Sequence, residues 1–110
     1  MATVPAEPGQ VIDVCPEGTA LADCTTGKLL RTDGLEVIRL VLPAGKELPT
    51  HSAPGEMTVH CLAGQVAFTA SDHMVPLHPG QLLSLTAGQP HAVRAVEDSL
   101  LLVTIVRGGK

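Results

Sequence analysis

Two histidines, His51 and His91, are the side chains whose type and position most clearly suggest chemistry in this chain. An imidazole ring can bind a metal ion, carry a proton or form hydrogen bonds near neutral pH. Each of the two follows a segment rich in glycine or proline, which is where a chain turns. We therefore predict that the fold brings both rings to one polar site inside a hydrophobic cup.

The elements that must position these histidines are predicted to be short β-strands. Residues 35–42, LEVIRLVL, have the leucine and β-branched content of a buried strand. Six further strand candidates follow, at 58–62, 65–70, 74–77, 81–86, 91–96 and 100–106. The segments between them are rich in turn residues and too short for the helix of a βαβ unit. The pattern predicts an all-β fold, an antiparallel sandwich or barrel.

The chain length and the distribution of proline and glycine predict one domain with an arm. A chain of 110 residues has room for one modest hydrophobic core. Prolines and glycines crowd residues 1–20, which no continuous helix or central strand tolerates. We predict an extended N-terminal arm over 1–20, a short turn at 23–27 and a single β-barrel domain over 21–110.

Composition and charge exclude several classes of partner. The formal net charge is −4, the seven Lys and Arg are dispersed, and the chain has one Phe and no Tyr or Trp. Neither phosphate-backbone binding nor base stacking is therefore expected, so we predict no nucleic-acid partner. No apolar run approaches the ~20 residues that span a bilayer, and the start lacks a signal-peptide pattern. We predict no membrane contact and a cytoplasmic location.

The three cysteines, Cys15, Cys24 and Cys61, do not form a CxxC pair. An odd number of cysteines does not suit a closed disulfide framework. The simplest interpretation is that all three are reduced thiols.

Two segments resemble the sequence motifs of the cupin superfamily. Residues 45–64 resemble the first motif in both glycines and in the first histidine, His51, and residues 80–95 resemble the second in its glycines and in His91. The resemblance implies an antiparallel jelly-roll β-barrel. Single-domain cupins are commonly homodimers, so the resemblance also implies a homodimer here.

The departures from these motifs concern the metal ligands. In metal-binding cupins the ligands are two histidines and a glutamate from the first motif and one histidine from the second. Ala53 stands where the second histidine would be and Met57 where the glutamate would be, so His51 and His91 alone carry over. Catalytic divalent ions usually take three protein ligands.

His60 is the candidate for a third ligand. Side chains alternate across a strand, so His60 points outward if Val59 and Cys61 face the interior. A β-bulge at Pro54-Gly55 would reverse this parity and give a His51/His60/His91 site. Both arrangements stay open at this point. His73 and His78 are interpreted as solvated turn residues.

Four apolar side chains are predicted to line the pocket: Met57, Val59 and Cys61 on one strand face, and Phe68 on the next strand. Two functions fit such a pocket. With a bound iron, manganese, nickel or zinc ion, the chain would act on a small organic molecule as a dioxygenase or isomerase does. Without a metal, it would be a binding or sensing module for a small molecule. Whether the chain is an enzyme is left open.

Overall fold

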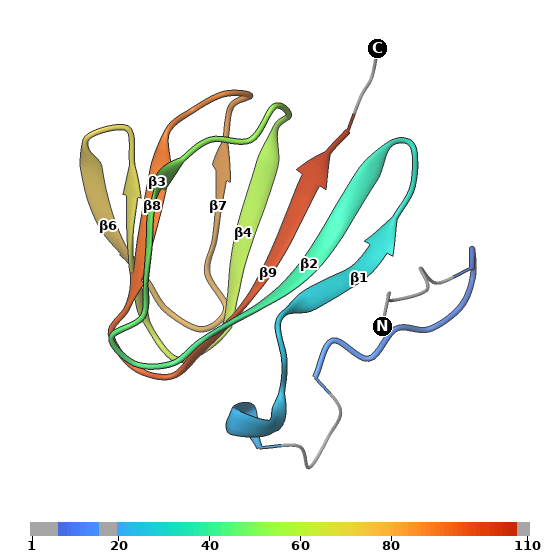
Figure 1. Cartoon of the computed structure of the whole chain (residues 1–110), viewed down its shortest axis with the longest axis horizontal. Coiled ribbons are helices and arrows are strands. Elements are labelled where there is room, and N and C mark those ends of the chain that lie inside the picture. Colours follow the sequence, from blue (N-terminus) through green and yellow to red (C-terminus); the bar gives the residue numbers. More distant parts are fainter. Residues whose placement is uncertain (1–6, 16–19, 108–110) are drawn as a thin grey trace.

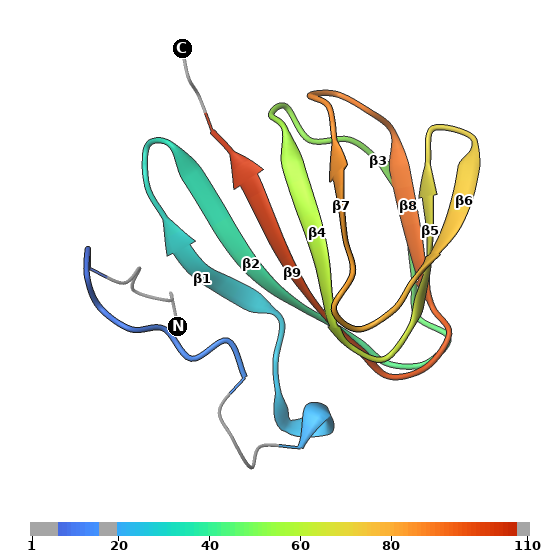
Figure 2. The ribbon, with the colours of Figure 1, turned by 180° about the vertical axis from the view of Figure 1, so that it is seen from behind.

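The computed structural model describes residues 7–15 and 20–107, whose strands form two antiparallel sheets that face each other (Figures 1 and 2). The larger sheet has the order β1 (Gly27–Arg31), β2 (Leu35–Leu42), β9 (Ser99–Val106), β4 (Met57–Ala63), β7 (Leu82–Leu85). The smaller sheet has the order β3 (Glu47–His51), β8 (His91–Ala95), β5 (Val66–Ala70), β6 (His73–Leu77). A 3-10 turn, η1 (Leu21–Asp23), precedes β1.

The chain passes repeatedly from one sheet to the other, because β2, β4, β7 and β9 belong to the larger sheet and the strands between them to the smaller one. This is a jelly-roll arrangement, and the predicted all-β antiparallel class is confirmed. The hydrogen-bond ladders of the two sheets do not join among the described strands, so the molecule is an open sandwich and not a closed barrel.

The strand boundaries follow the side-chain pattern closely where that pattern is strong. β2 has the predicted bounds, and the other six predicted strands agree to within one residue at each end. Two strands, β1 and β3, were not predicted. β1 is short and runs from Gly27 to Arg31, and β3 contains Pro49, which is tolerated because β3 lies at the edge of its sheet.

The core fills the space between the inner faces of the sheets. Phe68, the single aromatic residue, is the largest fully buried side chain, and Leu42, Leu101, Val59 and Val66 are buried with it. On β4 and β8 burial alternates from residue to residue, as expected for strands with one face on the core.

A buried hydroxyl secures the turn between β4 and β5. Ser99, at the start of β9, is fully buried; its Oγ donates to the carbonyl of Glu97 at 2.6 Å and accepts from the N–H of Gln65 at 3.1 Å. Gly64 has a φ of +80°, and a Cβ there would collide with the backbone at Asp98. This turn therefore requires glycine both for its conformation and for its close approach to β9.

The described part of the N-terminal arm, residues 7–15, contains no helix or strand and lies beside β1 (Figure 1). Residues 1–6 and 16–19 of the arm lie outside the described residues, whereas Ala20 is described. Arg39 on β2 holds this segment by donating to the carbonyl of Val14 at 2.8 Å. No described helix has the length and apolar character needed to cross a membrane.

Candidate functional site

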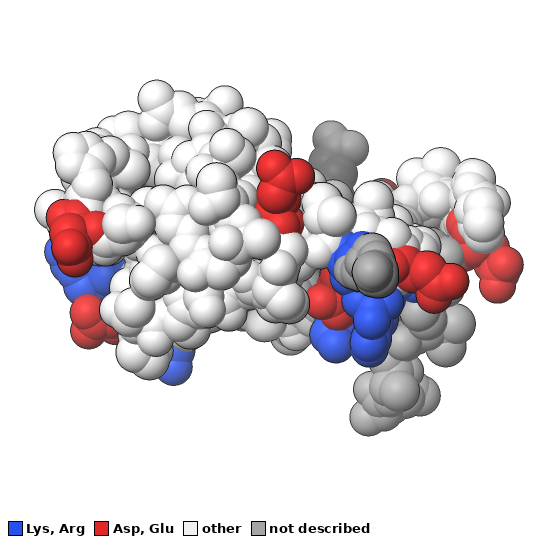
Figure 3. Space-filling model, turned by 90° about the horizontal axis from the view of Figure 1, so that it is seen from above, with Lys and Arg blue, Asp and Glu red and all other residues white. Residues whose placement is uncertain are grey.

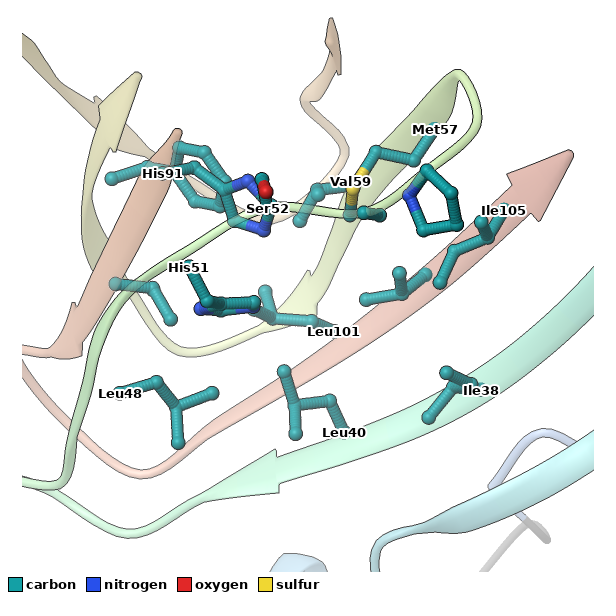
Figure 4. A pocket seen from close by; sticks show the side chains of 15 residues that line it. Ile38, Leu40, Leu48, His51, Ser52, Met57, Val59, His91, Leu101 and Ile105 are labelled. Atoms are coloured by element: carbon teal, nitrogen blue, oxygen red, sulfur yellow. The ribbon is translucent and has the colours of Figure 1, made fainter. Parts of the chain in front are cut away.

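A cavity of about 340 Å³ lies between the two sheets (Figure 4). Side chains from both sheets line it: Ile38, Leu40, Leu48, His51, Ser52, Ala53, Pro54, Met57, Val59, Phe68, His91, Val93, Leu101, Val103 and Ile105. Alternate residues of β2 and β9, such as Leu40 and Leu101, form the wall on the side of the larger sheet. The cavity is therefore formed by the inner faces of the two packed sheets.

The two histidines are direct cross-strand partners. His51 ends β3 and His91 begins β8, and the register of these paired strands places the two residues opposite each other. Their ring centroids are 4.3 Å apart and the ring planes meet at 60°. Sequence-distant imidazoles thus form one edge-to-face pair on the cavity wall.

In each histidine, Nδ1 is hydrogen-bonded to the backbone carbonyl of the residue two positions earlier. The Nδ1 of His51 lies 2.8 Å from the carbonyl of Pro49, and the Nδ1 of His91 lies 3.0 Å from the carbonyl of Gln89. A carbonyl oxygen can only accept, so each Nδ1 must carry the proton in these bonds. In the neutral ring, Nε2 is then a hydrogen-bond acceptor, and no described residue bonds to it in either ring.

The two histidines differ in burial. His91 is only 4% exposed and stacks against Phe68, with ring centroids 5.8 Å apart and planes at 9°. His51 is exposed. His91 is consequently a fixed part of the wall, and His51 is the member of the pair that solvent or an entering ligand meets first.

The cavity lining contains no Asp, Glu, Lys or Arg. Figure 3 shows a face of the molecule with a broad area that carries few such residues, and most of those visible lie toward its two ends. Besides the histidines, the polar side chain in the lining is Ser52. Polar recognition in the cavity is thus concentrated at one histidine pair.

The structure places the predicted site residues in two groups. Met57, Val59 and Phe68 line the cavity with the histidine pair. Cys61 is fully buried deeper in the core and does not line the cavity, although it shares a face of β4 with Val59. Burial raises the pKa of the Cys61 thiol, which keeps it protonated at neutral pH.

His60 is not brought to the other two histidines. It lies on the face of β4 opposite Val59 and pairs with Leu82 of β7. The irregularity in β4 falls between Cys61 and Ala63, after His60, so it does not reverse the parity of His60 relative to Val59. His73 and His78 are both exposed, but His73 is not a turn residue as interpreted from the sequence: it is the first residue of β6, and His78 directly follows that strand.

The side chains present do not fit the metal site of the resemblance. Among the described residues, no group of three or more His, Cys, Asp or Glu stands close enough to hold a metal ion. Ala53 and Met57, at the two departing motif positions, both line the cavity and offer no oxygen or nitrogen there. The pair His51 and His91 falls short of the three protein ligands usual for a catalytic ion.

Sequence reasoning missed much of the wall. Leu48 was missed because β3 was not recognised as a strand, and Ser52 lies in the irregular segment after it. Ile38 and Leu40 could have been found, since they alternate along a strand that was predicted with the right bounds.

The antiparallel jelly roll, with one histidine on each of two paired strands from the two motif segments, defines a cupin-type domain. Residues 38–106 match the cupin domain family Cupin_2, and this chain belongs to that family. The matched part includes both histidines and every cavity residue.

Known proteins similar to this chain differ in how much of their length it covers. A 78-residue stretch is 31% identical to dimethylsulfoniopropionate lyase DddQ of Ruegeria pomeroyi; it is 70% of this chain and 39% of that relative. An RmlC-like cupin from Desulfovibrio desulfuricans has 27% identity and a TM-score of 0.68, over 96% of each chain. A conserved Streptococcus pyogenes protein of unknown function has 24% identity and a TM-score of 0.77, covering 100% of this chain and 97% of its own.

Proposed function

We propose that this chain is a binding module for a small, mostly apolar organic molecule that carries a hydroxyl group. The observation that carries the proposal is the histidine pair: two rings with Nδ1 bound to backbone carbonyls, set in a cavity whose other lining side chains are apolar except for Ser52. A hydroxyl donating to Nε2 of His51 or His91 would supply the hydrogen bond that the lining leaves unmade.

Size and polarity support this class of ligand. A cavity of about 340 Å³ is at the lower end of the range for organic ligands, which runs from roughly 300 to 1,000 Å³. Aliphatic walls from Leu40, Leu48 and Leu101 favour apolar ligand surface. A charged ligand would lose its hydration without meeting a charged partner, which is costly.

The lyase activity of the similar protein gives a negative control. Dimethylsulfoniopropionate carries both a sulfonium and a carboxylate group, and no charged side chain lines this cavity to receive either. We expect no saturable binding of this compound.

The test compares para-cresol with para-xylene, in which a methyl group replaces the hydroxyl at nearly the same shape. The protein has no Trp or Tyr, so the near-ultraviolet absorbance of each probe can be followed in equilibrium dialysis with little protein background. We expect His51→Ala to weaken para-cresol about fivefold more than para-xylene, the effect of one hydrogen bond. His78→Ala, an exposed histidine away from the cavity, is the matched control and should change neither affinity.

Equal weakening of both probes in His51→Ala and also in His91→Ala would contradict the proposed hydrogen bond to the pair. Failure of both probes to bind would contradict the proposed ligand class.

A metal-dependent dioxygenase or isomerase is the alternative. Nδ1 bonded to a carbonyl is also the arrangement of metal-ligating histidines, which makes a direct metal test necessary. The protein is incubated with iron, manganese, nickel or zinc, dialysed and analysed for metal content. Near-stoichiometric metal that is lost in His51→Ala would overturn the metal-free binding function; loss in His60→Ala as well would establish a three-histidine site.

A further inference from the structure

A pair of thiols lies outside the cavity, where the N-terminal arm meets the start of the sheet. The Sγ atoms of Cys15 and Cys24 are 2.7 Å apart, and neither cysteine is in a disulfide. Cys15 ends the described part of the arm, and Cys24 follows η1 directly. Cys24 is buried and Cys15 is half-buried, so the pair is reached from the side of Cys15.

Arg39 holds the two cysteine-bearing segments together. Its Nε donates to the carbonyl of Thr25 at 2.7 Å and its Nη1 to the carbonyl of Val14 at 2.8 Å. These carbonyls belong to the residues next to Cys24 and Cys15. A guanidinium is planar and always charged, so the two bonds fix both backbones relative to one another.

The position of Cys24 is further fixed by its own backbone. Its N–H donates to the carbonyl of Leu21 at 3.1 Å, closing η1. The backbones that carry the two thiols are thus held by hydrogen bonds that do not involve sulfur, in addition to the contact between the two Sγ atoms.

We propose that Cys15 and Cys24 are a redox-active pair that forms an intramolecular disulfide by exchange with a low-molecular-weight disulfide such as oxidised glutathione. Neither residue touches the cavity, so the proposal is independent of the function proposed for the cavity.

The exchange takes place in two balanced steps. The more accessible Cys15 loses its proton to water, and its thiolate attacks one sulfur of oxidised glutathione, which forms a mixed disulfide and releases one glutathione thiolate. Cys24 then loses its proton, and its thiolate attacks Sγ of Cys15, displacing the second glutathione thiolate. Both released thiolates take up protons. The two cysteines are oxidised and one glutathione disulfide is reduced to two thiols.

Cys61 is the built-in control. It is fully buried in the core, and its Sγ contacts the carbonyls of Ala63 and Gly64. An odd number of cysteines is thus divided by the structure into an adjacent pair and one isolated core thiol. We expect Cys61 to take no part in the exchange.

The experiment equilibrates the full chain in mixtures of reduced and oxidised glutathione, quenches with acid, alkylates free thiols under denaturing conditions and measures the intact mass. With increasing oxidised glutathione, two alkylation sites should disappear together, and peptide mapping should find Cys15 linked to Cys24. Cys61→Ser should behave as the parent chain does. Cys15→Ser and Cys24→Ser should each lose the intramolecular product.

Two further readouts separate a positioned pair from incidental oxidation. Arg39→Met keeps the aliphatic stem but removes both donors, so we expect its disulfide to need an oxidised-to-reduced ratio about tenfold higher, since the effective concentration of the thiols falls. Oxidation should raise the Tm of the parent chain by about 10 °C, because the bond restricts the unfolded chain, and should leave the Tm of Cys24→Ser unchanged.

Alkylation of all three thiols at every glutathione ratio would overturn the proposal. So would products limited to mixed glutathione disulfides, or to chains joined through Cys15. If Arg39→Met forms the disulfide at the same ratio of oxidised to reduced glutathione as the parent chain, the two hydrogen bonds of Arg39 do not position the cysteines. That result would likewise overturn the proposed positioning.

Discussion

Ala53 and Met57 determine what the two histidines can do. Both side chains line the cavity beside the pair, and neither offers a ligand atom of the kind that a hard divalent ion prefers. With alanine and methionine at these positions, the two histidines are hydrogen-bond acceptors in a largely apolar pocket. With histidine and glutamate in their places, the same pair would belong to a four-ligand site.

Restoring the motif should therefore create a metal site. We expect the double variant Ala53→His/Met57→Glu to bind nickel or zinc about a hundredfold more tightly than the parent chain, measured by isothermal titration calorimetry. Met57 is buried, so a glutamate at this position should lower the Tm of the metal-free variant. Metal binding should raise the Tm again. Ala53→His/Met57→Gln is the matched control. No gain in affinity would mean that the segment between β3 and β4 does not direct these side chains at the pair.

The candidate site could be predicted from the sequence where local pattern determines position. The two histidines could be assigned to one site because each occupies a corresponding place in two turn-bounded motifs, whereas the strand neighbours of His60 left both its outward and its inward orientation open. Two features could not be predicted, because they depend on how the two sheets pack: the contact of His91 with Phe68 and the separation of Cys61 from the cavity.

At the scale of elements, turns fixed by glycine hold the sandwich in register. Gly64 and Gly80 both have positive φ, but only at Gly64 would a Cβ meet backbone atoms, those of the segment that opens β9. The Ser99 hydroxyl binds the same turn, so a shift of the backbone there would also cost hydrogen bonds.

We expect Gly64→Ala to lower the free energy of unfolding by about 3 kcal/mol, combining left-handed strain with the backbone clash. Gly80→Ala is the matched control, because it has a similar φ of +88° with open space around the Cβ, and should cost about 1 kcal/mol. Urea unfolding of both variants measures the difference. Equal losses would show that the close approach of Gly64 to β9 contributes nothing.

The strands themselves show where sequence patterns suffice. The Leu- and Val-rich strands β2 and β9 have unambiguous sequence patterns, because their side chains pack both against the core and against side chains of neighbouring strands. β1 and β3 lie at sheet edges, where one side has no neighbouring strand and the side chains are less constrained. The edge strands β6 and β7 were nevertheless predicted, and each ends on a buried leucine; β1 and β3 contain no fully buried residue, so their sequences lack the signal.

At the scale of the whole molecule, the homodimer implied by the resemblance stays a prediction. The sheets end in strands with one unpaired edge, and Leu82 on the edge strand β7 is 59% exposed. We expect sedimentation velocity to give a dimer for the parent chain and a monomer for Leu82→Lys. A parent chain that sediments as a monomer at micromolar concentration would contradict the prediction.

The pH dependence of stability should report on the core thiol. Burial raises the pKa of Cys61 above its ordinary value of 9.0, so on raising the pH the unfolded chain loses this proton before the folded chain does. The free energy of unfolding is then unaffected below about pH 8 and falls above pH 9, at most by about 1.4 kcal/mol per pH unit.

The measurement is urea unfolding from pH 7 to pH 10 under reducing conditions. It is made in a Cys15→Ser/Cys24→Ser background, so that Cys61 is the remaining thiol. Adding Cys61→Ala should make the curve flatter above pH 9, while the lysines contribute equally to both variants. Parallel curves would mean that the folded state tolerates a thiolate at this position, which its full burial between the two sheets should forbid.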